Sequence, residues 1–346
     1  MKEKVSVIIP CYNVELYIDR CLASVVNQTI GLDKLEIICV NDASTDGTWE
    51  KLCSWESKYS ENIILINCIE NGAQGRARNI ALNHASGSYI TFLDADDWVE
   101  LDTYERMYQA MERYDCDIVK CGWTADLGRG DIWEIQKKRF GNDYLLNIDS
   151  IEERRKFLTT GLMGDMCVDK MYRASIIFDH QLTFPEQCKY EDIYWGILSY
   201  FYVERIYFME EIMYHYYKNS ESTTMTKNVA YHMDRLSVVM HLWEECERRG
   251  LLEYYFKEME LNFLIHYYLG GIKTLTLRYT DLKYEVFQEI CRTVQKTIPH
   301  YKENPYIKEI LSEMDQLQIA LIDQNISREE FQQAMNLVYG HMLENK

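Results

Sequence analysis

SYITFLDADD, residues 88–97, places three carboxylates within four positions directly after an apolar run. The run is typical of a strand covered on both faces of a parallel sheet, where ligands bind beyond the carboxyl ends of the strands. Asp94, Asp96 and Asp97 repel one another, so gathering them at a strand end is unfavourable. A hard divalent cation relieves the repulsion, since Mg²⁺ and Mn²⁺ bind one or two carboxylates together with substrate phosphates. The alternatives are a solvated acidic turn and a helix cap at Asp97, and the place after an apolar strand favours the cation.

Other apolar runs, rich in β-branched residues, alternate with segments of helical spacing on both sides of this stretch. The remaining predicted strands are residues 5–10, 35–40, 63–68 and 117–123, and the predicted helices are residues 18–26, a segment carrying Trp49 and Leu52, residues 75–85 and residues 101–113. Repeated β-α-β units predict an α/β fold with a Rossmann-like, mostly parallel sheet and helices on both faces.

The rest of the chain changes character in two steps. Residues 126–220 mix short strands and helices, among them a helix at 190–203 with an acidic start. From about residue 225 onward the pattern is almost entirely helical. The predicted helices there are residues 229–249, 252–277, 282–297, 306–323 and 328–343.

Composition limits the classes of function. The 346 residues suit two domains, or one with a large extension, and the net charge of −18 argues against nucleic-acid binding, which needs clustered cations. A small anionic ligand then needs a local cation, which a bound metal supplies. The 11 cysteines show no C-x-x-C spacing, a strand-like run replaces a signal peptide, and no apolar run is long enough to span a membrane. We therefore expect free thiols and a cytoplasmic protein.

The loops after the first two predicted strands carry polar side chains. Pro10 ends the first strand, and Tyr12 and Asn13 can face a base or ribose, although Asn13 can equally cap the next helix. After the second strand, Asp42 can accept a hydrogen bond from a pyrimidine ring N–H, whereas residues 44–46 are suited to capping a helix.

The loop after the third strand is rich in glycine and arginine. In NGAQGRARN, residues 71–79, glycines such as Gly72 let backbone N–H groups approach a ligand, and a helix start favours anions. Arg78 can reach a phosphate or the base-binding carboxylate; the alternative is a solvated arginine at a helix start. No G-K-[ST] follows, so this is not a Walker loop.

Four motifs in this order, VSVIIPCYN, VNDASTDGT, NGAQGRARN and FLDADD, resemble the family 2 glycosyltransferases of the GT-A fold. The resemblance is strong over about the first 125 residues and weaker to about residue 225. It implies a GT-A catalytic domain at 1–225, with a nucleotide-sugar half (1–125) and an acceptor half (126–225), followed by an α-helical domain at 226–346.

The resemblance also implies roles for individual residues. It places Asp94 near the ribose and Asp96 on a Mn²⁺ or Mg²⁺ ion, and Arg78 on the nucleotide side. The positions that match the nucleoside-binding residues of the family are Pro10, Tyr12, Asn13 and Asp42.

Looser matches follow in the acceptor half. Residues 170–173, KMYR, resemble a K-L-Y-[KR] stretch, and Glu191-Asp192 resembles an E-D motif whose aspartate is the catalytic base. Acids at a helix start also stabilise the helix through its dipole. His215 and Ser222-Thr223-Thr224 resemble a segment that closes over the diphosphate, with His215 a candidate metal ligand; in YHYY a packed histidine is the alternative.

The function implied by the resemblance is inverting transfer of a sugar from a nucleoside diphosphate donor, with UDP favoured by Asp42, to a saccharide or lipid-linked saccharide acceptor. Two alternatives remain open. A sugar-nucleotide nucleotidyltransferase would carry a glycine-rich basic loop where this chain has PCYN. A non-catalytic nucleotide-sugar-binding scaffold would not need both acidic motifs. The helical C-terminal region is a candidate surface for homo-oligomers or for peripheral contact with the inner face of the membrane.

Overall fold

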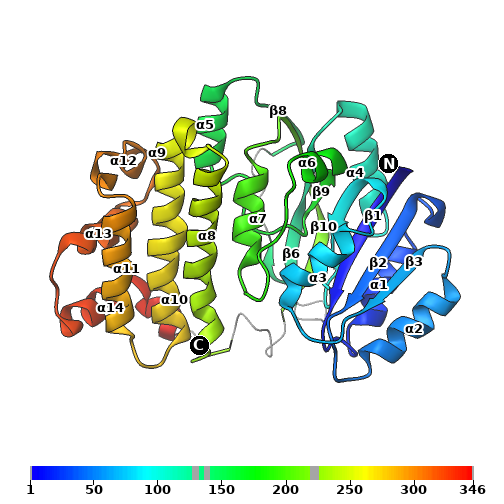
Figure 1. Cartoon of the computed structure of the whole chain (residues 1–346), viewed down its shortest axis with the longest axis horizontal. Coiled ribbons are helices and arrows are strands. Elements are labelled where there is room, and N and C mark those ends of the chain that lie inside the picture. Colours follow the sequence, from blue (N-terminus) through cyan, green and yellow to red (C-terminus); the bar gives the residue numbers. More distant parts are fainter. Residues whose placement is uncertain (1, 127–131, 136–140, 219–225, 345–346) are drawn as a thin grey trace. The chain divides into compact units, whose positions relative to one another are not determined.

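The computed structural model describes residues 2–126, 132–135, 141–218 and 226–344 (Figure 1). Contacts divide the chain into two compact units. The first is Met1–Arg154 with Met163–Asn219, and the second is Arg155–Leu162 with Ser220–Lys346. Helix α5 (Ile151–Thr159) therefore contributes to both units.

The first unit begins with a parallel sheet of four strands in the order β3-β2-β1-β4. Ile8, in the middle of β1, pairs with Ile38 on one side and Phe92 on the other. All three side chains are buried, as expected of strands covered on both faces. These strands are β1 (Lys2–Cys11), β2 (Leu35–Asn41), β3 (Ile63–Asn67) and β4 (Gly87–Phe92).

Beyond β4 the sheet is mixed. The order continues β9-β6-β10-β5, in which β9 is antiparallel to both neighbours, β6 and β10 are parallel, and β5 is antiparallel to β10. Strands β7 and β8 add antiparallel pairs to β6 and β10. The predicted parallel arrangement is thus found among β1 to β4, the strands of the nucleotide-sugar half. These strands are β5 (Trp98–Val99), β6 (Ile118–Asp126), β7 (Ile132–Ile135), β8 (Tyr144–Asn147), β9 (Lys170–Arg173) and β10 (Arg205–Tyr217).

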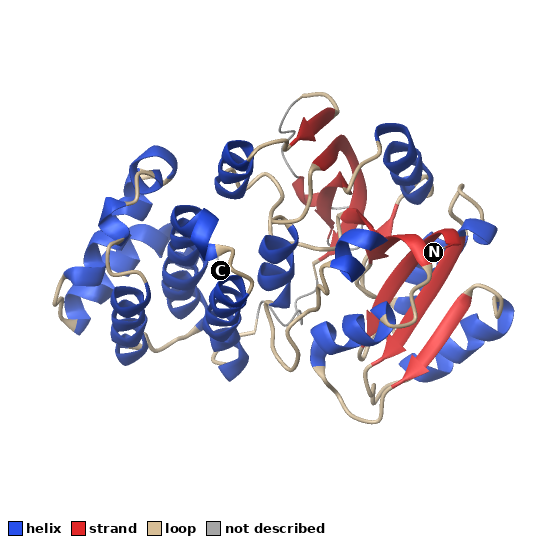
Figure 2. Cartoon of the chain, turned by 45° about the horizontal axis from the view of Figure 1, so that its top comes forward, coloured by secondary structure: helices blue, strands red, loops and turns tan. Residues whose placement is uncertain are grey.

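Helices flank this sheet (Figure 2). In α1 the spacing of Ile18, Leu22 and Val25 puts all three side chains on one buried face, which explains why the segment is helical and where it packs. The other helices of the first unit are α2 (Thr48–Lys58), α3 (Ala73–Leu82), α4 (Thr103–Tyr114), α6 (Ala174–Asp179) and α7 (Glu191–Ser199), with α1 at Ile18–Val26.

The second unit is helical and has its own core, which includes Phe263, Tyr268 and Phe331. The predicted helix at 252–277 is interrupted by a π-helix, Leu264–Leu269. The main helices of the second unit are α8 (Asp234–Arg248), α9 (Leu252–Phe263), α10 (Gly270–Arg278), α11 (Tyr284–Thr297), α12 (Tyr306–Ile310), α13 (Glu313–Ala320) and α14 (Arg328–Glu344). Within the described residues, no helix is both long and apolar enough to cross a bilayer.

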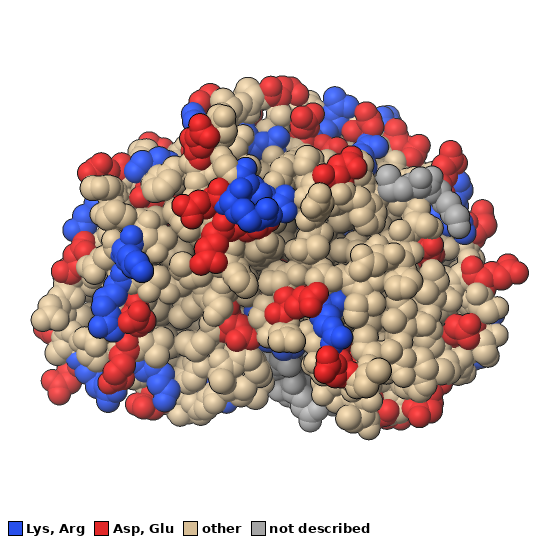
Figure 3. All heavy atoms as spheres, in the orientation of Figure 1, with Lys and Arg blue, Asp and Glu red and all other residues tan. Residues whose placement is uncertain are grey.

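The distribution of surface charge and the burial of the thiols can be described directly. On the face shown in Figure 3, Lys and Arg side chains lie among Asp and Glu rather than in one basic patch. The cysteines are free, and most are buried.

Gly75, in the first turn of α3, marks a close approach of two backbones. A Cβ at this position would lie 2.1 Å from the carbonyl oxygen of Pro185 and 3.3 Å from the Cβ of Phe184. Asn79, one turn on, exchanges hydrogen bonds with the backbone N–H and C=O of Phe184, at 2.8 and 2.9 Å. Helix α3 therefore has little freedom to move away.

We expect Gly75→Ala to lower the free energy of unfolding by about 1–3 kcal/mol, since overpacking forces the backbone apart. Gly340→Ala is the control, because Gly340 lies in α14 with open space around it and alanine favours helix by up to about 1 kcal/mol. Thermal unfolding of both variants checks this. A Gly75→Ala melting temperature at or above that of the wild type would contradict the close approach.

Candidate active site

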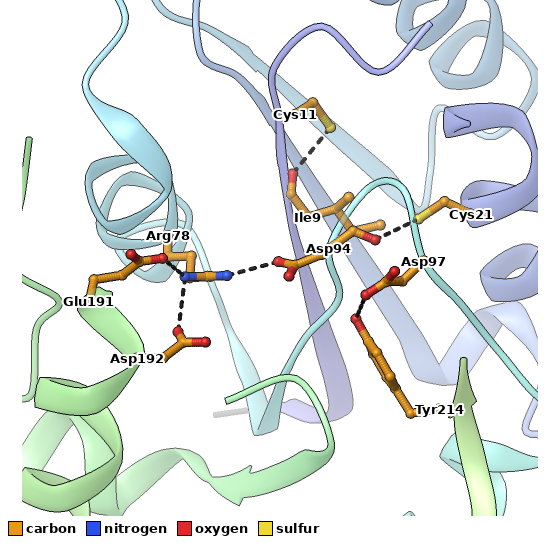
Figure 4. A network of polar contacts seen from close by, with 9 residues as sticks. All are labelled: Ile9, Cys11, Cys21, Arg78, Asp94, Asp97, Glu191, Asp192 and Tyr214. Carbon is orange, nitrogen blue, oxygen red and sulfur yellow. Dashed lines mark hydrogen bonds and ion pairs between the residues drawn. The ribbon is translucent and has the colours of Figure 1, made fainter. Parts of the chain in front are cut away.

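Arg78 joins two acidic motifs that lie far apart in the sequence. Helix α3 buries this side chain to 1% exposure, and Nη2 donates to Asp94 Oδ1 at 2.8 Å. Nη1 lies 2.6 Å from Glu191 Oε1 and 3.3 Å from Asp192 Oδ1 (Figure 4). One guanidinium thus holds together the end of β4 and the start of α7.

The three carboxylates after β4 have three different surroundings. Asp94 pairs with Arg78, whereas Asp97 is fully buried and accepts bonds from the Tyr214 hydroxyl and, at 2.7 Å, from the Tyr217 N–H. Asp97 therefore ties this turn to β10. It does not cap the following helix, because α4 begins only at Thr103.

Unlike Asp94 and Asp97, Asp96 has neither an ion pair nor a side-chain donor on its carboxylate within the described residues. Burial, together with the charge of Asp94, raises the pKa of Asp96 to about 7. Within the described residues, no side chain donates to the Asp96 carboxylate, and its backbone carbonyl accepts a bond from Arg20 at 2.7 Å. An uncompensated carboxylate beside a second one favours a cation.

The donor set of Asp94 and Asp96 fits a hard divalent ion that keeps water and phosphate oxygens as its other ligands. Across the part of the chain that the structure describes, no three His, Cys, Asp or Glu side chains are placed to hold a metal by themselves. His215, the third predicted ligand, has its Nε2 2.7 Å from Glu100 Oε1, and its ring is stacked on Trp98 at 5.0 Å. A carboxylate pair completed by a ligand's phosphates is therefore the arrangement that these residues suit.

The loops after β1 and β2 are tied together. Asn13 has a φ of 52° and accepts a 2.8 Å bond from the Thr45 N–H, while its own N–H donates to Ser44 Oγ at 3.0 Å. Asn13 does not cap α1, which begins at Ile18. Pro10 is buried in β1 and Tyr12 is 48% exposed, so the loop presents an aromatic ring to the solvent.

Asp42, directly after β2, is buried beneath these loops. Burial raises its pKa, and both of its carboxylate oxygens accept the Gly72 N–H, at 2.9 and 3.1 Å. Asp42 thus already orders the loop before α3. Arg78, which we expected to reach either a phosphate or this carboxylate, is bonded instead to the acids of β4 and α7.

Helix α7 begins at the E-D pair. Glu191 is buried, whereas the Asp192 side chain is 27% exposed. Burial raises the pKa of Asp192 to about 7; Arg78 opposes the shift, and the charges of Glu191 and Asp94 add to it. A carboxylate with a pKa near neutrality is suited to accepting a proton.

Lys170, from the KMYR stretch, lies in a buried ion cluster. It pairs with Asp169 Oδ1 at 2.6 Å, Lys120 pairs with the other oxygen, and burial lowers the pKa of Lys170 to about 8. Ser222-Thr223-Thr224 lies outside the described residues.

Sequence reasoning missed Arg20, Lys120 and Asp169. Lys120 and Asp169 are buried charges, and their ion pair depends on the antiparallel pairing of β6 with β9. No sequence motif predicts that pairing. Arg20 occupies a helix position that is typical of a solvated arginine, and only the packing of α1 near the β4 turn brings it to Asp96.

A model of glycosyl transferase family 2 matches residues 6–179, which is half of the chain and runs from the middle of β1 through β4, including Arg78. The chain belongs to this family. Glycosyltransferase GlyA of Streptococcus pneumoniae is 27% identical over 90% of this chain and 45% of its own length. Poly(ribitol-phosphate) beta-glucosyltransferase of Bacillus spizizenii is 31% identical over 66% of this chain and 34% of its own length. The chain spans less than half the length of these two relatives.

Solved structures support the fold expected of the family. TarS 1-349 of S. aureus in complex with UDP has a TM-score of 0.70 at 18% identity, over 99% of this chain and 92% of that one. TarS 1-349 in complex with UDP-GlcNAc has a TM-score of 0.69 at 20% identity, over 95% and 92%. The predicted GT-A architecture is thereby confirmed.

We expect Arg78→Met to destabilise the chain by about 3–5 kcal/mol, since it leaves buried carboxylates without their counterion. Arg76→Met is the control from the same helix, because the polar contacts of Arg76 are to the exposed Glu70, an ion pair at 3.6 Å and a hydrogen bond to its carbonyl oxygen at 3.3 Å. Urea unfolding at neutral pH measures both. Equal loss of stability in the two variants would show that the Arg78 ion pairs do not stabilise the fold.

Proposed function

We propose that this chain is an inverting, metal-dependent glycosyltransferase that moves a sugar from a nucleoside diphosphate donor, UDP-sugar, to an acceptor hydroxyl in cell-surface polysaccharide synthesis. The observation that carries the proposal is the Arg78 bridge. It gathers the acids at the end of β4, which suit a cation and a diphosphate, and the Asp192 carboxylate, which suits a base, around one guanidinium.

The donor half of the proposal uses the loops after β1, β2 and β3. Tyr12 offers an exposed ring for a base, and Asp42 a buried acceptor for a pyrimidine N–H once its bond to Gly72 rearranges. The short segment that carries Tyr12 lies between Pro10, which is buried in β1, and Asn13, which is hydrogen-bonded to Ser44 and Thr45. The TarS structures were solved with UDP and UDP-GlcNAc, which supports uridine as the base.

The acceptor is proposed from the family relatives. Several relatives are named as glycosyltransferases of poly(ribitol-phosphate), a polymer that carries polyol hydroxyls. A saccharide or polyol hydroxyl of such a polymer is the class of acceptor that we propose here.

Asp96 and Asp94 would hold a Mn²⁺ or Mg²⁺ ion, with His215 available as a further ligand only if its contact with Glu100 breaks. The ion, when bound, neutralises charge on the leaving diphosphate and orients it. Arg78 supplies fixed positive charge beside Asp94 and holds the Asp94 carboxylate in place through their ion pair.

Asp192 is the proposed general base. It accepts the proton of the acceptor hydroxyl while the oxygen bonds to the anomeric carbon and the bond from that carbon to the diphosphate oxygen breaks. Attack opposite the leaving group inverts the configuration at that carbon. Burial raises the pKa of Asp192 to about 7, Arg78 opposes the shift, and the charge of Glu191, which is paired with the same guanidinium, adds to it.

Asp96→Ala is expected to abolish the gain in UDP affinity that Mn²⁺ gives, whereas Asp192→Asn keeps that gain and loses turnover about 10²–10⁴-fold. Isothermal titration with UDP, with and without Mn²⁺, and release of UDP from a UDP-sugar measure the two effects. Asp102→Asn is the control, an exposed aspartate just before α4. An Asp96→Ala variant that binds UDP and Mn²⁺ as the wild type does would refute the metal assignment, and release of pyrophosphate would indicate a nucleotidyltransferase.

The pH dependence of turnover follows from Asp192. A base works when it is ionised, so kcat/KM should rise about tenfold per pH unit below the pKa of about 7 and level off above it. Rates across that pKa at saturating Mn²⁺ measure the profile. A flat profile through neutrality would exclude Asp192 as the proton acceptor.

A further inference from the structure

Arg20 holds the turn that carries Asp96, from outside the family motifs. It lies on α1, and its Nη2 donates to the Asp96 carbonyl oxygen at 2.7 Å. Its guanidinium carbon is 3.8 Å from the centre of the Trp98 ring and 4.8 Å from the centre of the Tyr217 ring. Two aromatic faces thus hold the guanidinium, because the negative face of each ring attracts the cation.

The aromatic partners of Arg20 are themselves held by the sheet. Trp98 is in β5 and pairs with His215 of β10 in antiparallel register, and the Trp98 and His215 rings are stacked at an interplanar angle of 6°. Tyr217 ends β10, and its N–H donates to Asp97, the residue after Asp96. The turn is therefore fixed at two adjacent points, by Arg20 at the Asp96 carbonyl and by β10 at the Asp97 carboxylate.

The choice of acceptor atom separates Arg20 from Arg78. Arg78 pairs with the Asp94 carboxylate, whereas Arg20 bonds to the carbonyl of Asp96. Within the described residues, the carboxylate of Asp96 receives no side-chain donor, so no other side chain competes with a cation for it. A cation beside a metal site repels the ion, so its benefit must come from orienting a ligand.

We propose that Arg20, clamped by Trp98 and Tyr217, is a positioning residue that fixes the Asp96 peptide and so holds the Asp96 carboxylate ready for the divalent cation. This role rests on the function proposed above, in which Asp96 binds the metal. It deepens that function by adding three residues, from α1, β5 and β10, to the metal site.

The test measures Mn²⁺ binding rather than turnover. The Mn²⁺ dissociation constant in the presence of UDP is obtained from the electron paramagnetic resonance signal of free Mn²⁺, and UDP affinity is measured separately without metal. We expect Arg20→Gln to raise the Mn²⁺ constant about tenfold, equivalent to about 1.4 kcal/mol, and Arg20→Lys to raise it less, since lysine keeps the charge but loses the planar fork. UDP affinity without metal should not change.

Arg106→Gln is the matched control, a partly exposed arginine of α4 that pairs with Glu211 at 2.6 Å. Trp98→Leu is a second variant, for use should Arg20→Gln fail to fold. It removes one of the two aromatic faces that hold Arg20 and should weaken Mn²⁺ binding. Unchanged Mn²⁺ binding in Arg20→Gln or, should that variant fail to fold, in Trp98→Leu overturns the inference. A wild-type chain that binds no Mn²⁺ with UDP instead overturns the metal part of the proposed function.

Discussion

The candidate site depends on a single buried cation. Arg78 is almost fully enclosed, and three carboxylates from two elements surround it, so neither the cation nor the acids would be stable at this depth alone. Glu191 lies 113 residues from Arg78 in the sequence. The mutual need for charge compensation therefore fixes how the first turn of α7 meets α3 and the end of β4.

The three aspartates after β4 show how one short motif is divided among tasks. Asp94 faces the guanidinium, Asp97 is buried against tyrosine groups of β10, and Asp96 has a carboxylate without a counterion. Arg78 offsets the negative charge of Asp94, whereas burial and the charges of neighbouring acids raise the pKa of both Asp96 and Asp97. Of the two carboxylates without a counterion, that of Asp97 is bonded to β10, and that of Asp96 is the one we propose for a metal ion.

The fold of the first unit was accessible from the sequence, because continuous apolar runs and helical spacing are local signals that β1 to β4 and α1 to α4 follow closely. The antiparallel insertion of β9 between β4 and β6 could not be predicted from the sequence, because strand order is set by non-local pairing. For the site, motifs named Arg78, Asp94 and Asp192, but their shared contact depends on tertiary packing. The same holds for Arg20, whose aromatic partners come from β5 and β10. The roles of all these residues stay predictions.

Helix α5 gives the chain an unusual route between its two compact units. The polypeptide passes into the helical unit at Arg155, returns at Met163, and passes into it again at Ser220. A single cut therefore cannot release either unit whole, because each is assembled from two separated pieces of sequence. A fusion that replaced only the chain from Ser220 onward would leave residues 155–162 of the helical unit behind.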